Sequence, residues 1–225
     1  MNSLSDTRTD LPFDSVSGRV APVGLSSKRF IDIVLASFGI ILLAPLLLMC
    51  VVLTWASSGG PVIFRHRRVG FGGKQFDCLK FRTMVADAPE RLRQHLESDS
   101  EAAAEWEATQ KLHNDPRVTA VGALLRKSSL DELPQLVNVL KGEMSIVGPR
   151  PVTEDELTKY GAFVGAYAAC RPGITGLWQV SGRSSMSYEQ RVECDTFYAR
   201  RWSLYLDVKI LIVTIPAVLF SEGAC

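Results

Sequence analysis

The stretch IVLASFGIILLAPLLLMCVVLTW, residues 33–55, decides the fold of this chain. It contains no charged residue, and as one helix it would be roughly 35 Å long at a rise of about 1.5 Å per residue. The apolar part of a bilayer is about 30 Å thick, so the stretch is long enough to cross a membrane. Pro45, at its centre, has no backbone N–H and its ring collides with the preceding turn, which predicts a sharp kink there.

The charges on the two sides of this apolar stretch have the same sign. Lys28 and Arg29 precede it, and a basic run at residues 65–68 follows it closely. Positive charges near both ends favour leaving both ends on the cytoplasmic side of the membrane. We therefore predict a helix that is broken at Pro45, dips into the membrane and returns. The alternatives are a kinked helix that crosses the membrane and a buried helix of a soluble protein.

A break at the proline frees backbone groups that need hydrogen-bond partners inside the membrane. We expect side chains such as Ser37 or Thr54, or packing against protein, to supply them. On this interpretation residues 28–58 form a re-entrant membrane helix.

The chain on either side of residues 28–58 has a different composition. Residues 1–27 are rich in Ser, Thr, Asp, Gly and Pro and lack the form of a secretory signal, so we predict a flexible N-terminal tail. Residues 59–225 are predicted to form a cytosolic and interfacial domain. Within it, the apolar stretch 208–220 is too short to cross a membrane, which predicts an interfacial helix, with a core helix as the alternative.

The totals exclude several classes of protein. The 225 residues suit one domain or a domain with an appendage, and the mean hydropathy of +0.11 is high for a soluble enzyme because of the apolar stretch. The formal net charge is only +1, which gives no general affinity for polyanions, and we predict no nucleic-acid partner. No pair among the five cysteines has C-x-x-C spacing and the three histidines are scattered, so we expect reduced cysteines and no zinc site.

The segment after the apolar stretch predicts a hairpin and then a helix. Two short strands, Pro61–Phe64 and Gln75–Phe81, flank the turn Gly70–Gly73. The turn lacks the G-x-x-x-x-G-K-[ST] spacing of a phosphate-binding P-loop. Residues Pro89–Leu112, rich in Ala, Glu, Arg and Gln, predict one charged and exposed helix.

Another helix is predicted to begin near Asp131 to Leu133 and to end at Gly142. Ser129 followed by Glu132 matches a capping box, and Pro134 is tolerated at low cost only in a first turn. Glycine is common directly after the last residue of a helix, so Gly142 marks its end.

The adjacent pair Asp131 and Glu132 is the strongest candidate for chemistry. At a helix start, carboxylates meet free N–H groups and the positive end of the helix dipole, which favours the ionised form that a nucleophile or metal ligand requires. The same position favours a phosphate nearby. The alternative is that the two side chains only cap the helix.

Two loops present arginines on restricted backbones. In Gly148–Pro151, two prolines flank Arg150 and hold a guanidinium suited to phosphate oxygens, the alternative being a structural turn with a surface salt bridge. The loop 171–180 and the following residues 181–183 combine arginines, glycines and an amide, which suits a nucleotide-sugar pocket. Further on, Glu193 and Asp195 offer an additional metal ligand.

Several of these segments occur together in an order that resembles one family. Lys28-Arg29 precede the proline-broken apolar stretch, and four motifs follow it: Lys80-Phe81-Arg82-Thr83-Met84, Asp131-Glu132-Leu133-Pro134-Gln135-Leu136, Gly148-Pro149-Arg150-Pro151 and Arg171-Pro172-Gly173-Ile174-Thr175-Gly176. This order resembles the bacterial sugar transferase family, the monotopic polyprenyl-phosphate phosphoglycosyl transferases. The resemblance runs from about Lys28 to Phe220, and several long motifs in the right order are far more specific than any one of them.

The resemblance implies a fold class and a set of site residues. The fold would be a small, mostly helical α/β catalytic domain in the cytosol, on a proline-broken re-entrant membrane helix and with interfacial amphipathic helices. Asp131 would be the nucleophile and Glu132 its metal-associated partner, with Mg²⁺ as cofactor and Asp195 as a further metal ligand. The predicted substrate-binding residues are Lys80, Arg82, Thr83, Arg150, Arg171, Gln179 and Arg183.

The implied activity is the transfer of hexose 1-phosphate from a UDP-hexose, UDP-galactose above all, to undecaprenyl phosphate. UMP would be released, and a covalent aspartyl-phosphosugar would form on the way. Within the family, the chain most resembles enzymes that start exopolysaccharide synthesis. It would work among the lipids of the bacterial inner membrane, with its catalytic domain facing the cytoplasm. The resemblance does not decide whether the enzyme forms a homodimer.

One position departs from the family pattern. Some small members have serine before the helix-breaking proline, where this chain has Ala44. A serine hydroxyl can satisfy a carbonyl freed at the kink, so the alanine puts that detail of the turn in doubt.

Two alternatives to this activity stay open. In single-displacement transfer, Asp131 and Glu132 would only bind the metal. In a non-catalytic membrane scaffold for polysaccharide assembly, both carboxylates would be dispensable. Their intact presence in the expected context favours an enzyme.

Overall fold

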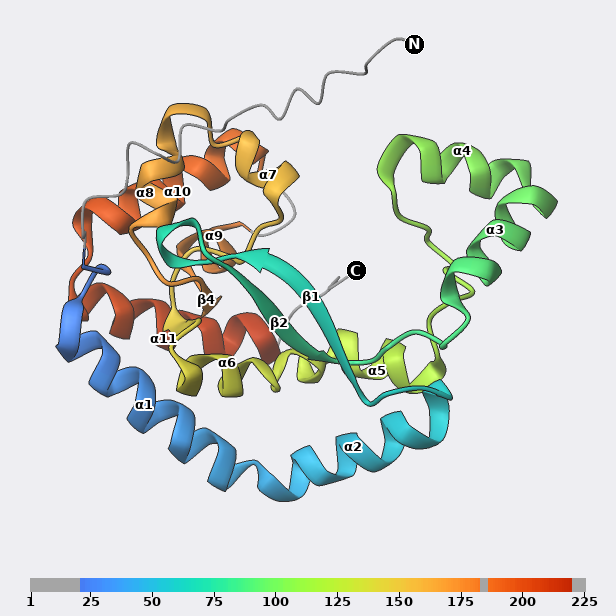
Figure 1. The fold of residues 1–225 in the computed structure, drawn as a ribbon, viewed down its shortest axis with the longest axis horizontal. Coiled ribbons are helices and arrows are strands. Elements are labelled where there is room, and N and C mark those ends of the chain that lie inside the picture. Colours follow the sequence, from blue (N-terminus) through green and yellow to red (C-terminus); the bar gives the residue numbers. More distant parts are fainter. Residues whose placement is uncertain (1–20, 183–185, 220–225) are drawn as a thin grey trace, which may run out of the picture.

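The computed structural model describes residues 21–182 and 186–219, which form a mostly helical molecule with two small sheets (Figure 1). The apolar stretch is divided into α1, Leu25–Leu42, and α2, Ala44–Ser58, with a bend of 66° between them. Pro45 lies in the first turn of α2, where a missing N–H leaves no helical hydrogen bond unmade. The predicted kink at this proline is confirmed. Among the described residues, no single helix is both long and apolar enough to cross a membrane, and α1 and α2 meet these requirements only as a bent pair.

The prediction that Ser37 or Thr54 satisfies the kink is wrong. Thr54 lies more than two turns beyond the bend, and its buried hydroxyl has no partner in the described part of the chain. Backbone groups close the break instead, because Leu43 N donates to Gly39 O (2.9 Å) and Leu47 N donates to Leu43 O (2.8 Å). The helical bond pattern therefore continues on both sides of the bend without a serine before the proline.

The hairpin consists of β1, Ile63–Val69, and β2, Gln75–Phe81, joined through the short 3-10 turn η2, Phe71–Gly73. β2 has the predicted bounds. β1 starts two residues later than predicted and continues through the basic run 65–68, so these side chains belong to a strand. The isolated bridge between Val69 and Val152 adds one further antiparallel contact at the end of β1.

The register of the hairpin decides which basic side chains share a face. Successive residues of a strand point to opposite faces, so Arg67 and Arg68 are separated by the sheet. Arg68 pairs with Phe76, which places Arg68, Phe76 and Lys80 on one face. This face is turned toward the helix that follows the Asp131–Glu132 pair.

That helix, α6, Gln135–Lys141, lies along the free edge of β2. The buried Asn138 side chain accepts from Leu79 N (3.0 Å) and donates to Asp77 O (2.8 Å), as a neighbouring strand would. Phe76 and Leu136 pack in the apolar core below it. The amide contacts and this packing together fix the start of α6 relative to the end of β2.

The predicted start of this helix is wrong. Ser129 has a left-handed backbone (φ 56°) and its side chain makes no capping hydrogen bond. Residues Leu130–Glu132 form a separate 3-10 turn, η3, and α6 begins only after Pro134. Pro134 has no N–H that could donate to the residue four positions earlier, so the α-helix does not include the residues before it. The 3-10 turn η3 precedes the helix instead. Gly142 ends α6 with φ 85°, as predicted.

The single helix predicted at residues 89–112 is in fact two helices, α3, Ala88–Ser98, and α4, Ser100–Thr109. Asp99 lies between them, and its carboxylate accepts from the backbone N–H groups of Glu101 (2.9 Å) and Ala102 (3.1 Å). Aspartate is favoured at the cap of a helix and not in its interior, so Asp99 divides the segment. Figure 1 shows both helices projecting away from α1 and α2.

Short helices and two longer ones, α10 and α11, complete the described part of the chain, most of them across the hairpin from α3 and α4 (Figure 1). Their bounds are α5, Ala120–Lys127; α7, Glu154–Thr158; η4, Gly161–Phe163; α8, Val164–Ala168; α9, Leu177–Ser181; α10, Tyr188–Arg201; and α11, Leu204–Leu219. α11 begins before the predicted apolar stretch 208–220, and Phe220 lies outside the described residues.

The second sheet consists of β3, Ser145–Val147, and β4, Gly173–Thr175, in parallel. It brings the two predicted arginine loops into backbone contact, with Gly148 N donating to Thr175 O (2.9 Å). A Cβ on Gly148 would lie 2.4 Å from Arg171 O, and one on Gly173 would lie 2.1 Å from Gly148 N. Glycine is therefore required on both loops for this close approach.

We expect Gly148→Ala to destabilise the protein by about 2 kcal/mol, because the added methyl group must displace backbone. The measurement is the thermal midpoint of the purified protein. Gly165→Ala is the matched control, since a Cβ there meets no atom within 4 Å. An equal midpoint for the two variants would contradict the steric argument.

A buried ion pair fixes the start of α1. Lys28 Nζ lies 2.6 Å from Asp207 Oδ2 of α11, and both side chains are buried. Asp207 also accepts hydrogen bonds from Tyr198 (2.7 Å) and Trp202 (3.0 Å). Because separating a buried pair leaves a charge without compensation, this network holds α1 against α10 and α11.

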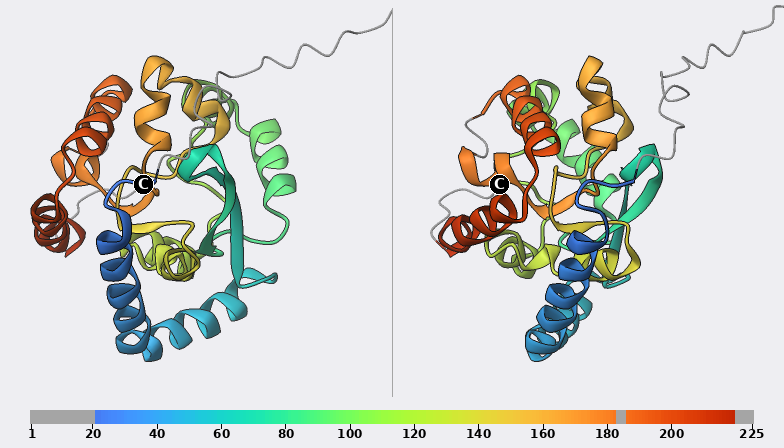
Figure 2. Two further views of the ribbon diagram at one scale, coloured as in Figure 1. Left: turned by 60° about the vertical axis from the view of Figure 1, so that its left-hand side comes forward. Right: turned by 90° about the vertical axis from the view of Figure 1, so that its left-hand side faces the viewer.

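α1 and α2 form a V at one side of the molecule, below α6 and the hairpin (Figure 2). Their outward faces and the outward face of α11 expose large apolar side chains. These are Phe30, Ile33, Val34, Phe38, Ile41 and Leu42 on α1; Leu48, Val52 and Trp55 on α2; and Tyr205, Ile212 and Ile215 on α11. An exposed apolar surface of this extent marks a site of interaction.

Candidate active site

Asp131 and Glu132 lie in η3, at the end of β2 and directly before α6. Asp131 is buried (8% exposed), and Glu132 is partly exposed. Lys80 Nζ lies 2.6 Å from Glu132 Oε1 and 3.7 Å from Asp131 Oδ2. Leu130 and Leu133 pack in the apolar cluster that includes Cys50 of α2. The carboxylate pair therefore lies beside the bent helices, with a lysine as its counter-charge.

The pKa values of the two carboxyl groups are shifted in opposite directions. Burial raises the pKa of Asp131 above its ordinary value, although Lys80 opposes this shift. Burial also raises the pKa of Glu132, but Lys80 and Arg150 outweigh it and hold that pKa below its ordinary value. Glu132 is thus the stable anion of the pair, and Asp131 is the more basic carboxylate. A more basic carboxylate is the better nucleophile.

Arg126, at the end of α5, belongs to the site although no sequence motif identified it. Its Nε donates to Thr83 Oγ1 (2.9 Å), and its charge lowers the pKa of Asp131. Thr83 is buried and holds this second cation in place. A Cβ on Gly122 would lie 2.0 Å from Thr83 O, so α5 approaches this closely only because residue 122 is glycine.

Arg150 lies near enough to Glu132 for its charge to lower the pKa of that carboxyl group. Its guanidinium lies over the ring of the buried Trp178, 5.8 Å from the centroid, and Arg191 lies over the same ring at 4.1 Å. Pro149 and Pro151 on either side are buried. The expectation that the two prolines restrict Arg150 agrees with this packing.

Arg68 is a further cation near the pair, although none of the predicted motifs contains it. Its NH1 lies 2.7 Å from Glu156 Oε2, and its NH2 lies 3.3 Å from His66 Nδ1. Glu156 also accepts from Thr153 N (2.9 Å) in a capping box at the start of α7. Arg68 lowers the pKa of Glu132, which places it on the same side of the hairpin as the pair.

Three of the predicted substrate residues contact other parts of the protein. Arg82 Nε donates to Pro61 O (2.6 Å) at the base of the hairpin. Arg171 Nε donates to Gly142 O (3.0 Å) at the far end of α6 from the pair. Gln179 Nε2 donates to Ile174 O (3.0 Å) within its own loop. Arg183 lies outside the described residues.

The three predicted metal ligands are not gathered at one point. Asp195 is buried in α10, where it accepts a hydrogen bond from Tyr160 (2.7 Å). Within residues 21–182 and 186–219, no three His, Cys, Asp or Glu side chains lie together as a metal site. Asp131 and Glu132 still fit Mg²⁺, which commonly takes one or two carboxylates and completes its shell with water and substrate phosphate.

Asp195 gives a prediction on stability. Burial raises its pKa to about 7, well above the ordinary pKa of an aspartate in an unfolded chain, which is about 3.9. Between these two pH values the folded state holds a proton that the unfolded state has lost, so stability falls as pH rises through this window. We expect Asp195→Asn to remove this loss, which is on the order of 4 kcal/mol at most. Thermal midpoints of wild type and variant at pH 5 and pH 8 measure the difference.

The exposed Glu193 lies two residues before Asp195 on the same helix. Glu193→Gln is therefore the control, and its midpoint should follow that of the wild type at both pH values. A constant gap between Asp195→Asn and wild type from pH 5 to pH 8 would show that Asp195 titrates normally.

The arrangement combines a basic, buried carboxylate with several cations and a nearby apolar surface. Lys80, Arg126 and Arg150 come from three segments far apart in the sequence. Such a cluster can bind the oxygens of a diphosphate and bring them toward a nucleophilic oxygen. The chemistry best suited to it is transfer of a phosphoryl group.

Comparison with known proteins gives consistent matches. The family model described as bacterial sugar transferase matches residues 23–221. The chain is 51% identical over 208 residues to the exopolysaccharide production protein ExoY of Rhizobium meliloti, a match that covers 92% of each chain.

Two other similar proteins have names that state a reaction. The undecaprenyl-phosphate galactose phosphotransferase of Salmonella typhimurium is 50% identical over 200 residues, which cover 88% of this chain and 41% of that protein. The UDP-glucose:undecaprenyl-phosphate glucose-1-phosphate transferase of Caulobacter vibrioides is 41% identical over 205 residues, which cover 88% of this chain and 71% of that protein.

Proposed function

Because this chain belongs to the bacterial sugar transferase family, we propose that it transfers hexose 1-phosphate from a UDP-hexose to undecaprenyl phosphate. The products are UMP and undecaprenyl-diphospho-hexose, which would start the synthesis of an exopolysaccharide. The names of the relatives from Rhizobium meliloti and Salmonella typhimurium support this assignment. The name of the Salmonella typhimurium relative also favours galactose as the hexose, with glucose as the alternative that the Caulobacter vibrioides relative suggests.

The observation that carries the proposal is the buried Asp131 beside Lys80 and Glu132. The Lys80 ammonium lies 3.7 Å from the Asp131 carboxylate and 2.6 Å from that of Glu132. A carboxylate and a diphosphate repel each other, and a cation in this position offsets the repulsion. The raised pKa of Asp131, which results from burial, makes its oxygen a stronger nucleophile.

The reaction we propose has two displacements at one phosphorus atom. An Asp131 oxygen forms a bond to the phosphorus that bears the hexose, and the bond from this phosphorus to the oxygen of UMP breaks. An oxygen of undecaprenyl phosphate then forms a bond to the same phosphorus, and the bond to Asp131 breaks. The carboxylate is restored, so both phosphate substrates use one site in turn.

The other side chains of the site have supporting roles in this mechanism. Arg126 lowers the pKa of Asp131 and Arg150 lowers that of Glu132, so both guanidinium groups are near enough to bind the oxygens of the donor diphosphate. We propose Mg²⁺ as cofactor, held by Glu132 and Asp131, where it would supply positive charge for the departing phosphate oxygen. Glu132, the stable anion of the pair, suits a metal ligand.

We also propose that α1 and α2 form a re-entrant membrane helix. Their exposed apolar faces and that of α11 would lie in the lipid, and the exposed Trp55 and Tyr205 would lie at its interface. The catalytic domain would then face the cytoplasm at the bacterial inner membrane. This position brings the carboxylate pair to the surface of the bilayer, where the polyprenyl substrate has its phosphate.

The covalent step is tested by supplying the donor alone. We expect the purified protein, incubated with UDP-galactose labelled in the sugar, to bind one label per chain and to release an equal amount of UMP. Undecaprenyl phosphate added afterwards should remove the label as lipid product. UMP that appears only when both substrates are present would indicate single displacement, and no UMP under any condition would favour a scaffold.

A further inference from the structure

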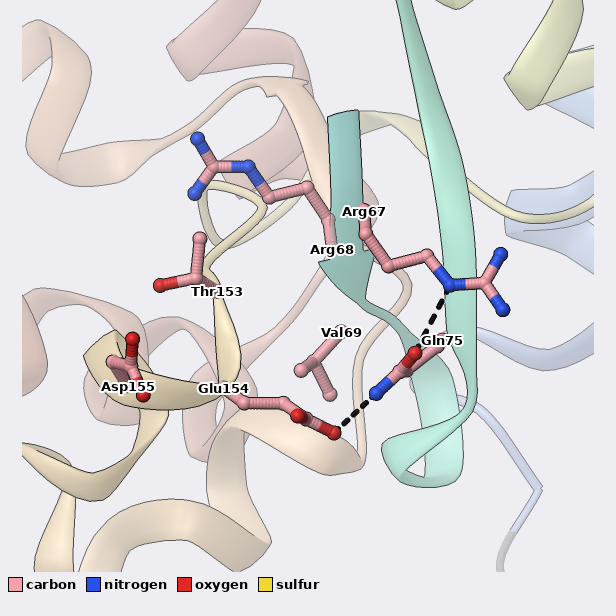
Figure 3. Close-up of a pocket in the computed structure, with 7 residues that line it drawn as sticks. All are labelled: Arg67, Arg68, Val69, Gln75, Thr153, Glu154 and Asp155. Atoms are coloured by element: carbon pink, nitrogen blue, oxygen red, sulfur yellow. Dashed lines mark hydrogen bonds between the residues drawn. The ribbon is translucent and has the colours of Figure 1, made fainter. Parts of the chain in front are cut away.

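A cavity of about 250 Å³ lies between the turn end of the hairpin and the start of α7 (Figure 3). One wall is a chain of hydrogen bonds in which Arg67 Nε donates to Gln75 Oε1 (3.0 Å) and Gln75 Nε2 donates to Glu154. The opposite wall has the Thr153 hydroxyl and the Asp155 carboxylate. The Asp155 carboxylate accepts no hydrogen bond from any described residue, so it is available to a ligand.

Arg68 connects this cavity with the catalytic pair. Its side chain lines the cavity, pointing away from that of Arg67 (Figure 3). It also lies on the face of the hairpin that carries Lys80, and its charge lowers the pKa of Glu132. Two of its nitrogens contact Glu156 and His66, while Nε has no partner among the described residues. A guanidinium in this position can bind the phosphate of a ligand that extends from the cavity to the Asp131–Glu132 pair.

The backbone between Arg150 and Thr153 also connects the cavity with the catalytic pair. Thr153 follows Arg150 by only three residues, and Val152 between them is fixed to Val69 of β1 by a backbone hydrogen bond of 2.9 Å. The wall of the cavity is therefore continuous with the loop that presents Arg150 to the pair.

The distance along the hairpin decides which part of a donor would fit the cavity. Arg68 pairs with Phe76, which lies four residues before Lys80 on the same face of β2, about 13 Å away at 3.3 Å per residue. The hexose is bonded to the phosphorus that Asp131 would attack, so it must stay beside the pair. The nucleoside is at the other end of the diphosphate, about this far away in an extended donor.

The geometry points to this cavity as the binding site for the nucleoside end of the donor, with Arg68 on the phosphate that departs as part of UMP. This inference rests on the proposed function. Asp155 would accept hydrogen bonds from the ribose hydroxyl groups, a role well suited to carboxylates in nucleotide sites. Thr153 and the Gln75 side chain would face the rest of the nucleoside.

Binding of UMP to the full-length protein in lipid nanodiscs tests the inference without any need for turnover. We expect Arg68→Gln to weaken UMP binding at least about tenfold, because a charge-assisted contact with phosphate is lost. Asp155→Asn should weaken it about fivefold. The controls are Arg65→Gln, on the opposite face of the same strand, and Asp87→Asn, on an exposed residue at the start of α3. Both should bind UMP within about twofold of wild type.

A nucleotide without ribose hydroxyl groups makes the test specific. Wild type should bind 2′,3′-dideoxy-UMP about fivefold more weakly than UMP, and Asp155→Asn should bind the two equally. This comparison tests the assignment of the cavity even if Arg68→Gln destabilises the protein and lowers its thermal midpoint. UMP binding by Asp155→Asn that matches wild type, with the same loss for the dideoxy nucleotide, would overturn the inference.

The same experiment separates this inference from the proposed function. If wild type releases UMP from UDP-galactose in turnover while both cavity variants bind UMP as wild type does, only the cavity assignment fails. If wild type neither binds UMP nor releases it from any UDP-hexose, the proposed function fails and the cavity assignment fails with it.

Discussion

Asp131→Asn is expected to lower the rate of sugar-phosphate transfer at least about a thousandfold, which corresponds to about 4 kcal/mol in the barrier. An amide has nearly the same shape as the carboxylate, but its oxygen is a poor nucleophile toward phosphorus. The Asp131 side chain is buried, and its carboxylate lies 3.7 Å from the Lys80 ammonium. The measurement is UMP release from UDP-galactose in the presence of undecaprenyl phosphate.

The variant should still insert in the membrane and unfold at a temperature close to that of the wild type, because asparagine fills nearly the same volume as the buried aspartate. Asp87→Asn, on an exposed residue at the start of α3, controls for the loss of one negative charge and should keep full activity. Transfer by Asp131→Asn within about tenfold of the wild-type rate would exclude a covalent bond to this residue.

Lys80→Met is expected to lower transfer about a hundredfold. The ammonium lies between the two carboxylates and is the main opposing influence on the burial that raises the pKa of Asp131. Without it, this pKa rises further, and a larger fraction of Asp131 is protonated at a given pH. Activity should therefore fall at a higher pH than in wild type as the solution is acidified. The profile of kcat/KM for the donor against pH measures this shift.

Lys74→Met is the matched control, since Lys74 is exposed in the hairpin turn and lies away from the pair. Its rate and its pH profile should be those of the wild type. A Lys80→Met enzyme with a lower rate but an unchanged acidic limb would mean that the lysine serves only to bind the donor. A normal rate would remove Lys80 from the mechanism.

The fold was predictable from sequence wherever a local signal determines the backbone. The kink at Pro45, the strand Gln75–Phe81 and the helix end at Gly142 were all predicted at the right positions. Each depends on a residue that restricts or frees its own backbone, or on a short alternating pattern. The two errors at helix boundaries, at Asp99 and at Ser129, arose because a local side chain or proline competed with a plausible helical pattern.

The site was predictable in part. The acidic pair, Lys80 and Arg150 lie together, and the chain segments that carry them were recognised as motifs. Arg68 was missed because β1 was predicted to end at Phe64. If the strand had been predicted to include residue 68, the alternation of side chains and the pairing with β2 would have placed Arg68 on the same face of the hairpin as Lys80. Arg126 had no such signal, since its approach depends on the contact between Gly122 and Thr83. Arg171 and Asp195 were predicted to be site residues from their sequence patterns. In the structure, Arg171 donates a hydrogen bond to Gly142 O and Asp195 accepts one from Tyr160.

The sequence by itself determined the family, the broken apolar helix and the acidic pair, because these depend on residues that are neighbours in the chain. Only the tertiary structure decided which cations surround Asp131, that its pKa is raised by burial, and that a separate cavity begins at Arg68. The physical reason is that burial and charge at a point are set by segments remote in sequence. Their meeting depends on how helices and strands pack, and no pattern within a single segment specifies that.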